Sequence, residues 1–255
     1  MPSQHARLSA SSSKAWLACS GYIAFQDHFK NEIAGEESEF AKEGTEAHSL
    51  AEKMLNHIFN KGQSVKRTRD NADMLYYVEQ YVDYVVNLHS DLVRKYGPKN
   101  VDIKIEQRLD FSNIVPEGYG TGDVVILTPA ETHVVDLKYG IGVPVSAYDN
   151  PQLKLYGLGA LNQYDELYDT EQIVLHIAQV RLDYGFSSFE ISRTDLLEWG
   201  ASVKVAADNI FAGNVSYKPG EDQCRWCEGR PMCAKRWELL FNPLRQIIKE
   251  RSEEL

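Results

Sequence analysis

Two aspartates and a lysine lie in one stretch of the chain, TGDVVILTPAETHVVDLKYG, at a spacing that suits phosphodiester hydrolysis. Asp123 begins one predicted strand and Asp136 ends its hairpin partner, so the two carboxylates can share a hard divalent cation. Because residues two apart on a strand point to the same face, Lys138 can enter this site with Asp136 while Leu137 packs behind them. A lysine there can stabilise the charge that develops on a phosphate under attack by water. D-x-K is also common as a solvated pair on surface strands, and the apolar residues around it are what favour a site here.

Two polar pairs on predicted helices can add to this site. Gln152 and Tyr156 lie one helical turn apart, just after the strands, where an amide and a phenol could contact a phosphate or hold the lysine. Their alternative roles are a helix-cap contact and a tyrosine at the edge of the core. His48 and Glu52 also lie one turn apart, and imidazole is a candidate extra ligand for manganese or magnesium. A lone histidine on a helix is more often structural, and the other six histidines are interpreted as structural.

The four cysteines define a second candidate site. Cys19 stands alone near the N-terminus, whereas Cys224, Cys227 and Cys233 form a C-x2-C-x5-C motif. Thiolates select zinc or iron–sulfur clusters, and either would join the two ends of the chain around the acidic site. We hypothesise a structural rather than a redox role, because closing so long a loop restricts the unfolded chain.

Basic and aromatic residues surround the C-terminal cysteines. They could grip a DNA backbone, or they could simply pack around the bound group. They are Arg225, Trp226, Arg230, Lys235 and Arg236.

The elements that must position these residues are a set of helices, a strand-rich centre and further helices. Periodicity predicts a short helix ending near Cys19, helices over 38–60, 71–95, 194–212 and 232–250, and a helix over 151–164 that Pro151 can start. Strands are predicted over 101–109, 122–127, 132–140, 172–180 and 187–192. The loop 61–70 is rich in Lys and Arg. The chain is therefore predicted to be a single mixed α/β domain. Within it, residues 1–100 form a helical N-terminal region, residues 101–192 form the core sheet and helix of the candidate catalytic site, and residues 193–255 form C-terminal helices with the cysteine segment.

Composition limits the classes of protein that fit. With 255 residues and 43% hydrophobic content, the chain can bury a sizeable core. It has no run of eighteen apolar residues and no apolar stretch near the N-terminus, so we expect no membrane span, no secretory signal and a cytoplasmic location. Thiols stay reduced there, which disfavours disulfides. The net charge of −10 argues against a general nucleic-acid coat, but a nuclease needs acids and only a local basic path.

In their order along the chain, these motifs resemble those of PD-(D/E)XK nucleases of the RecB type, in the iron–sulfur branch that includes AddB-type helicase–nuclease subunits and the CRISPR adaptation nucleases. The resemblance covers most of the chain. LSASSSKAWLAC resembles the family's serine-rich opening helix with its first cysteine, and GTEAH resembles its histidine motif. GTGD and DLK resemble its two acidic motifs, QLKLY its Q-x-x-x-Y motif, and KPGEDQCRWCEGRPMC its terminal cysteine motif.

The resemblance implies a restriction-endonuclease-like core, in which helices flank a mixed central sheet, with N-terminal helices and a C-terminal cysteine appendage. Asp123 and Asp136 would hold a catalytic Mg2+ or Mn2+, with the Leu137 carbonyl and His48 as further ligands. Lys138 would orient or polarise the attacking water. The second acid is Asp136 where many members have glutamate, and the family pattern allows either.

The resemblance also implies roles for the remaining motif residues. Gln152 and Tyr156 would contact the DNA or support the site. Glu106 lies where relatives often carry an acid, and it is assigned no role. Ser20 stands where many members have proline, which barely affects ligation. A [4Fe–4S] cluster would be held by Cys19, Cys224, Cys227 and Cys233.

The leading prediction is a metal-dependent DNA exonuclease in recombination, repair or phage DNA processing, similar to small phage or prophage recombination exonucleases and then located in the bacterial host cytosol. No G-x-x-x-x-G-K-[ST] motif occurs, so the chain is predicted to be a stand-alone nuclease module or one that borrows a motor or loader from a partner. Candidate partners are a phage recombinase, an annealing protein or a helicase.

Two other classes of function compete with this prediction. The first is a non-catalytic DNA-binding or assembly module that uses the cysteine clamp and the basic loop, and the presence of both acids and the lysine disfavours it. The second, ranked last, is a cysteine-based redox or zinc-regulatory protein. Cys224 and Cys227 do not follow the start of a βαβ unit, which disfavours a thioredoxin-like motif.

Overall fold

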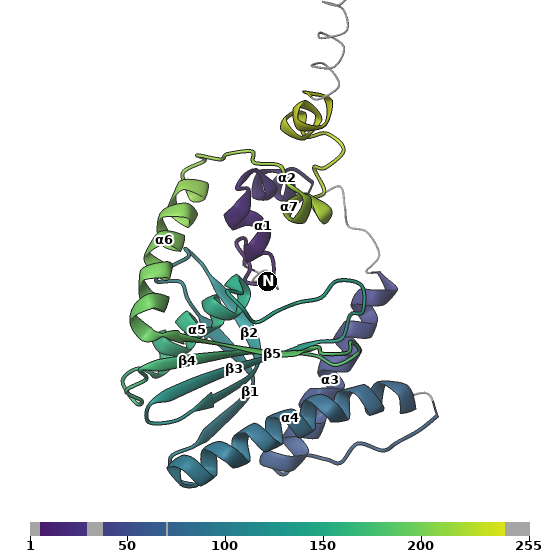
Figure 1. The fold of residues 1–255 in the computed structure, drawn as a ribbon, viewed down its shortest axis with the longest axis vertical. Coiled ribbons are helices and arrows are strands. Elements are labelled where there is room, and N and C mark those ends of the chain that lie inside the picture. Colours follow the sequence, from purple (N-terminus) through teal and green to yellow (C-terminus); the bar gives the residue numbers. More distant parts are fainter. Residues whose placement is uncertain (1–5, 30–37, 70, 243–255) are drawn as a thin grey trace, which may run out of the picture.

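The computed structural model describes residues 6–29, 38–69 and 71–242. At its centre is a five-stranded sheet in the order β1-β2-β3-β4-β5 (Figure 1). Strands β3 and β4 are parallel, and the other neighbouring strands are antiparallel. The strands span Asp102–Asp110, Tyr119–Leu127, Glu131–Lys138, Gln172–Gln179 and Phe186–Ser192.

Helices flank this mixed sheet, which confirms the predicted α/β class and is consistent with a restriction-endonuclease-like core. Helices α3 (Glu39–Phe59) and α4 (Ala72–Tyr96) pack on one face, and α5 (Pro151–Tyr164) and α6 (Arg193–Phe211) pack on the other.

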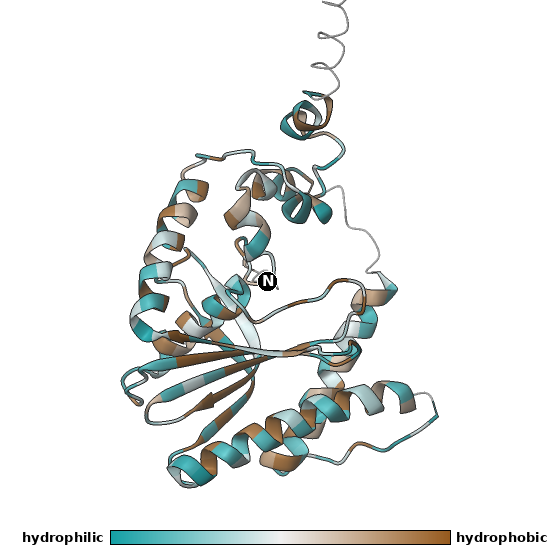
Figure 2. Cartoon of the chain, in the orientation of Figure 1, coloured by the Kyte–Doolittle hydropathy of each residue, from teal (hydrophilic) through white to brown (hydrophobic). Residues whose placement is uncertain are grey.

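Each face of the sheet has its own apolar cluster. Val125 and Val134 pack toward α5 and α6, whereas their neighbours Val124 and Val135 pack toward α3 and α4. Because a strand alternates its side chains between two faces and both faces are covered, the central strands are hydrophobic almost throughout, as their brown colour in Figure 2 shows. This double burial fixes the register of the strands that carry the acidic motifs.

Local signals explain several element boundaries. Helix α5 begins at Pro151, where the side chain of Asn150 accepts hydrogen bonds from the backbone N–H groups of Gln152 and Leu153. Helix α4 ends at Tyr96 and is capped by Gly97, whose φ of 85° suits glycine. Thr128 closes the hairpin between β2 and β3, because its hydroxyl exchanges hydrogen bonds with the backbone of Glu131.

Three elements near the cysteines and the acidic motif differ from the prediction. Strand β2 begins at Tyr119, before the predicted start. Helix α2 (Gly21–Phe29), which follows α1 (Ser13–Ala18), is missed by the periodicity. A short helix, α7 (Glu221–Arg225), lies within the cysteine segment. Of the predicted helix over 232–250, residues 234–242 are helical and the rest lies outside the described residues.

Long-range packing accounts for the missed helix α2. A Cβ on Gly229 would lie 2.0 Å from the ring of Phe25, and one on Gly21 would lie 2.3 Å from the ring of Tyr217. Both contacts join α2 to the C-terminal cysteine segment. A short helix gains most of its stability from such packing, which a local pattern does not contain.

Helix length and polarity bear on the expectation of no membrane span. Every helix in the described residues is too short or too polar to cross a bilayer.

Candidate active site

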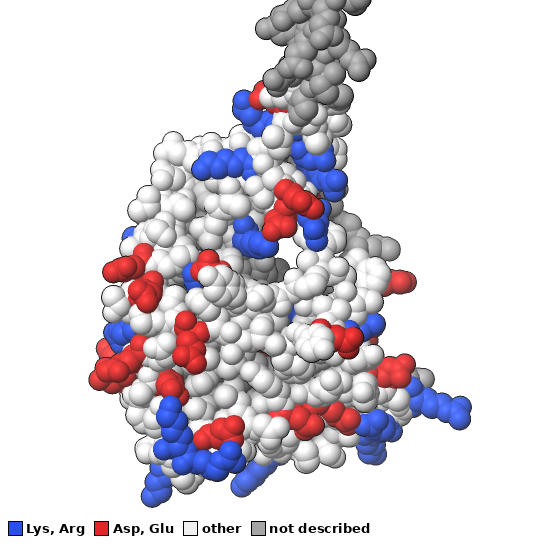
Figure 3. Space-filling view, in the orientation of Figure 1, with Lys and Arg blue, Asp and Glu red and all other residues white. Residues whose placement is uncertain are grey.

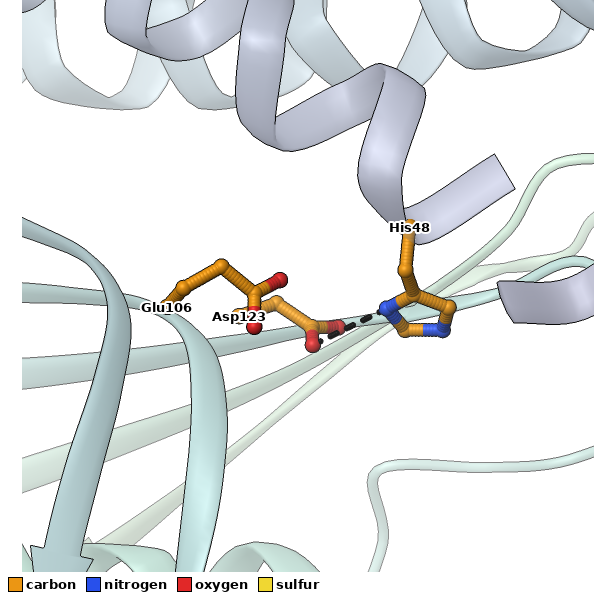
Figure 4. A group of neighbouring side chains, drawn as sticks. All are labelled: His48, Glu106 and Asp123. Carbon is orange, nitrogen blue, oxygen red and sulfur yellow. Dashed lines mark hydrogen bonds and ion pairs between the residues drawn. The ribbon is translucent and has the colours of Figure 1, made fainter. Parts of the chain in front are cut away.

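Three side chains with metal-binding groups meet at one edge of the sheet (Figure 4). His48 comes from α3, Glu106 from β1 and Asp123 from β2, and one donor atom of each lies within 4.8 Å of the others. His48 Nδ1 is 3.1 Å from Asp123 Oδ1. Two carboxylates and an imidazole form a donor set that fits a hard divalent cation such as Mg2+ or Mn2+. We call these three residues the ligand group.

Glu106 reaches the ligand group from a strained backbone conformation. Its φ is 50°, in the left-handed region that a non-glycine residue rarely adopts within a strand. The β1–β2 pairing is regular on both sides of it, with Ile105 opposite Val124 and Gln107 opposite Gly122. Such a conformation costs about 1–2 kcal/mol, and strain of this kind is concentrated at functional sites.

The charges within the ligand group depend on one another. Burial disfavours the charged form of His48, but Asp123, with a smaller effect of Asp136, raises the pKa of the imidazole to about 9. Burial and the negative charge of Asp123 raise the pKa of Glu106 to about 7. In the metal-free protein near neutral pH, the positive charge among these carboxylates is therefore the imidazolium, and Glu106 is about half protonated.

A second set of side chains forms a closed network beside the ligand group. The buried Asp136 directs Oδ2 to Lys138 Nζ at 2.7 Å, and its Oδ1 accepts a hydrogen bond from Gln152 Nε2 at 3.0 Å. Lys138 Nζ also donates to Gln152 Oε1 at 3.1 Å, and Gln152 Nε2 donates to the Tyr156 hydroxyl at 3.3 Å. We call Asp136, Lys138, Gln152 and Tyr156 the lysine network.

Opposing effects set the charges in the lysine network. Burial raises the pKa of Asp136, and the ammonium of Lys138 opposes that rise without cancelling it. For Lys138, burial favours the neutral amine, but the Asp136 carboxylate outweighs it and raises the pKa of the lysine. Lys138 is therefore a cation at neutral pH, held in place by two fixed partners.

The backbone of β3 joins the two sets, because the N–H of Leu137 donates to Asp123 Oδ2 at 2.6 Å. A glycine of the GTGD motif makes room for the lysine network, since a Cβ on Gly120 would lie 2.7 Å from the Tyr156 ring. The structure thus brings together all the residues that the sequence places in the acidic site. Asp136 contacts Lys138 and Gln152 and is not part of the ligand group. The roles of Asp136 and of the Leu137 carbonyl as metal ligands stay predictions.

The sequence assigns no role to two residues that lie at this site. Glu106 belongs to the ligand group, although the alternation of its strand resembles that of any surface strand. Tyr81 on α4 lines a small cavity together with His48, Glu106 and Asp123. It lies on the apolar stripe of its helix, where the sequence alone indicates a core tyrosine.

A groove of about 850 Å³ has Lys138 and Gln152 among the residues that line it. Its other walls are the serine-rich segment before α1, the loop that leads to α5 and the cysteine segment. Tyr148 and Trp226 line the groove and are strongly exposed, and Arg225 lies beside them. Figure 3 shows the molecule hollowed between the sheet and the helices above it, with several Lys and Arg side chains bordering the upper side of the hollow.

The two ends of the chain that carry the cysteines pack together, with α1 beside α2 and α7 (Figure 1). An ion pair of 2.8 Å joins Lys14 to Asp222, and the N–H of Lys218 donates to Cys19 Sγ at 3.2 Å. Burial raises the pKa of Cys227, the N–H of Gly229 acts against this, and the other three cysteines raise the pKa further. Four cysteines from both ends of the sequence are thus neighbours. Among the described residues, however, no three cysteine sulfurs all lie within 4.8 Å of one another, as the donor atoms of the ligand group do.

Comparison with known proteins places the chain in a family. The model of a family of unknown function, DUF2800, matches residues 5–252, so the chain belongs to that family. The chain is similar to the crystal structure of a "Putative exonuclease" from Eubacterium rectale, at 10% identity and a TM-score of 0.46, over 88% of this chain and 86% of that one. It is also similar to the crystal structure of SSO0001, at 15% identity and a TM-score of 0.30, over 75% of this chain and 98% of that one.

Proposed function

We propose that the protein is a Mg2+- or Mn2+-dependent nuclease that acts on DNA, and that it works as an exonuclease of the RecB type. The observation that carries this proposal is the position of Lys138. The lysine is held as a cation by the buried Asp136, beside a ligand group for a divalent cation and at the wall of a groove.

The residues of the site have complementary tasks in phosphodiester hydrolysis. His48, Glu106 and Asp123 would hold the cation, and Asp136, whose charge interacts with His48 and Asp123, would join them as a further ligand. A divalent cation in this position supplies an activated water and positive charge for the phosphate. The ammonium of Lys138 stabilises negative charge on the phosphate, and Gln152 fixes its direction, because the amide bonds both Lys138 and Asp136.

The groove supplies a path for the DNA to the lysine network. The exposed rings of Tyr148 and Trp226 can stack on bases, and the serine hydroxyls and Arg225 can contact phosphates. The side chain of Lys138 is 26% exposed and lines the groove, where its ammonium would meet a phosphate. With a net charge of −10, the protein depends on this local surface to attract DNA.

We further propose that the four cysteines hold a [4Fe–4S] cluster that fixes one wall of the groove. A tetrahedral zinc with Zn–S bonds of about 2.3 Å needs sulfurs about 3.8 Å apart, whereas no three of the cysteine sulfurs all lie within 4.8 Å of one another. The backbone N–H groups that face Cys19 and Cys227 suit cluster thiolates. Iron and acid-labile sulfide in anaerobically purified protein would support the cluster, whereas one zinc per chain in a colourless, active protein would exclude it.

The decisive test of the nuclease is cleavage of end-labelled linear DNA and of a covalently closed circle, with Mn2+, Mg2+ or chelator. We expect metal-dependent loss of the linear DNA alone, and loss of that activity in Asp136→Asn. Asp208→Asn is the matched control, because Asp208 forms an exposed pair with Lys204 on α6. Equal cutting by Asp136→Asn would contradict the proposed site. Binding of DNA without cutting would favour a non-catalytic DNA-binding module.

A further inference from the structure

The hydroxyl of Tyr81 lacks a hydrogen-bond partner in the described part of the chain, although the side chain is completely buried. Buried tyrosine hydroxyls normally find a partner, and leaving one unpaired costs about 1–3 kcal/mol. Tyr84, one turn further along the same helix, shows the usual arrangement. Its hydroxyl lies 2.8 Å from Nδ1 of His176.

The surroundings of Tyr81 are those of the ligand group. The side chain lines a small cavity whose other walls include His48, Glu52, Glu106 and Asp123. Burial, followed by the negative charges of Asp123, Asp136 and Glu106, raises the pKa of Tyr81 well above its usual value. The phenol therefore stays protonated, and it can act here only as a hydrogen-bond donor or a weak acceptor.

The hydrogen bonds of Asp123 explain why such a donor is useful. In the metal-free protein, Asp123 Oδ1 faces His48 Nδ1 and Oδ2 accepts from the Leu137 N–H. A nitrogen that binds a cation cannot also donate to Asp123, so with Nδ1 as the ligating atom of His48 the carboxylate of Asp123 keeps only the Leu137 N–H. A donor from Tyr81 would restore a second partner, and groups of this kind tune metal affinity.

We infer that Tyr81 is a positioning residue of the metal site, whose hydroxyl donates to the carboxylates of the ligand group when a divalent cation is bound. This inference rests on the proposed function, because it assumes that the ligand group holds a cation. It assigns to Tyr81 no contact with the DNA and no part in proton transfer. It accounts for a polar atom that the fold of the metal-free protein leaves unpaired.

The test compares Tyr81→Phe with Tyr84→Phe, because each change removes one hydroxyl from the same helix. The Kd for Mn2+ is measured by electron paramagnetic resonance, and the Tm is measured in chelator. For Tyr81→Phe we expect a Kd at least tenfold higher and an unchanged or higher metal-free Tm, since the unpaired hydroxyl is removed. For Tyr84→Phe we expect the opposite pattern, with a lower Tm and an unchanged Kd.

The outcomes separate this inference from the proposed function. An unchanged Kd in Tyr81→Phe, with Mn2+ bound by the wild type, would overturn the role of Tyr81 and leave the nuclease proposal intact. A raised Kd in a protein that cuts no DNA would support Tyr81 and contradict the nuclease. Absence of Mn2+ binding by the wild type would overturn both. Cutting by Tyr81→Phe that returns at high Mn2+ would further support a role in metal affinity alone.

Discussion

The ligand group and the lysine network are joined through strands β2 and β3, yet they differ in how completely their polar atoms are paired. In the lysine network, Asp136, Lys138 and Gln152 make short contacts with one another, although Asp136 Oδ2 has only its ion pair with Lys138 and no well-aligned hydrogen bond. The ligand group contains a strained Glu106, and Tyr81, whose hydroxyl is unpaired, lines the same small pocket. The difference fits a lysine network that is preorganised by the protein alone and, under the proposed function, a ligand group that a bound cation would complete.

The largest expected effect comes from breaking the lysine network. Lys138→Ala removes the ammonium that, under the proposed function, faces the phosphate, so we expect cleavage to fall by about 10²–10³-fold. The Kd for Mn2+ should change much less, because Lys138 is outside the ligand group. Lys204→Ala on α6 is the control. Comparable loss of Mn2+ binding and of cleavage would show that the two sets act as one unit.

The pH dependence of metal binding sharpens the comparison. The pKa of His48 is raised to about 9, so below that pH the imidazole must lose a proton before it binds a cation. Affinity for Mn2+ should therefore rise with pH, by about tenfold per unit between pH 7 and pH 9, and more steeply below pH 7, where Glu106 is also protonated.

Calorimetry in buffers of different ionisation enthalpy measures the protons released in this reaction. We expect one to two protons per Mn2+ at pH 7, and a smaller number in His48→Gln. Mn2+ binding that is independent of pH from 6 to 9 would contradict the assignment of His48 as a ligand.

A smaller effect tests the strain at Glu106. Glycine adopts a φ of 50° without a steric penalty, whereas alanine does not. Both Glu106→Gly and Glu106→Ala remove the acid, so we expect Glu106→Gly to be more stable than Glu106→Ala by about 1 kcal/mol in chemical denaturation without metal. At the neighbouring exposed strand residue Arg108, the order should reverse, because glycine is unfavourable in a regular strand. A more stable Glu106→Ala would show that the backbone there is not strained.

Much of the site could be predicted because its determinants are local. The hairpin at Thr128 and the period of two along β3 bring Asp123, Asp136 and Lys138 together, and Pro151 sets the start of the helix that carries Gln152. These signals lie within a few residues of the side chains that they position.

The unpredicted features depend on contacts between distant segments. Helix α2 is stabilised by the cysteine segment, the conformation of Glu106 belongs to one residue within a regular ladder, and the hydroxyl of Tyr81 is unpaired only because of what surrounds it. Periodicity carries none of this information: it places Glu106 on an ordinary strand and does not single out Tyr81.

The most direct test of a cation held by the ligand group is Mn2+ binding and DNA cleavage measured together in the wild type and in Asp123→Asn. Asp123 contacts both His48 and the backbone of Leu137, and the exchange keeps the shape of the side chain while it removes the charge. We predict that Mn2+ binding to the ligand group and metal-dependent cleavage are lost together, while the metal-free protein stays folded. Undiminished Mn2+ binding and cleavage in Asp123→Asn would contradict the account.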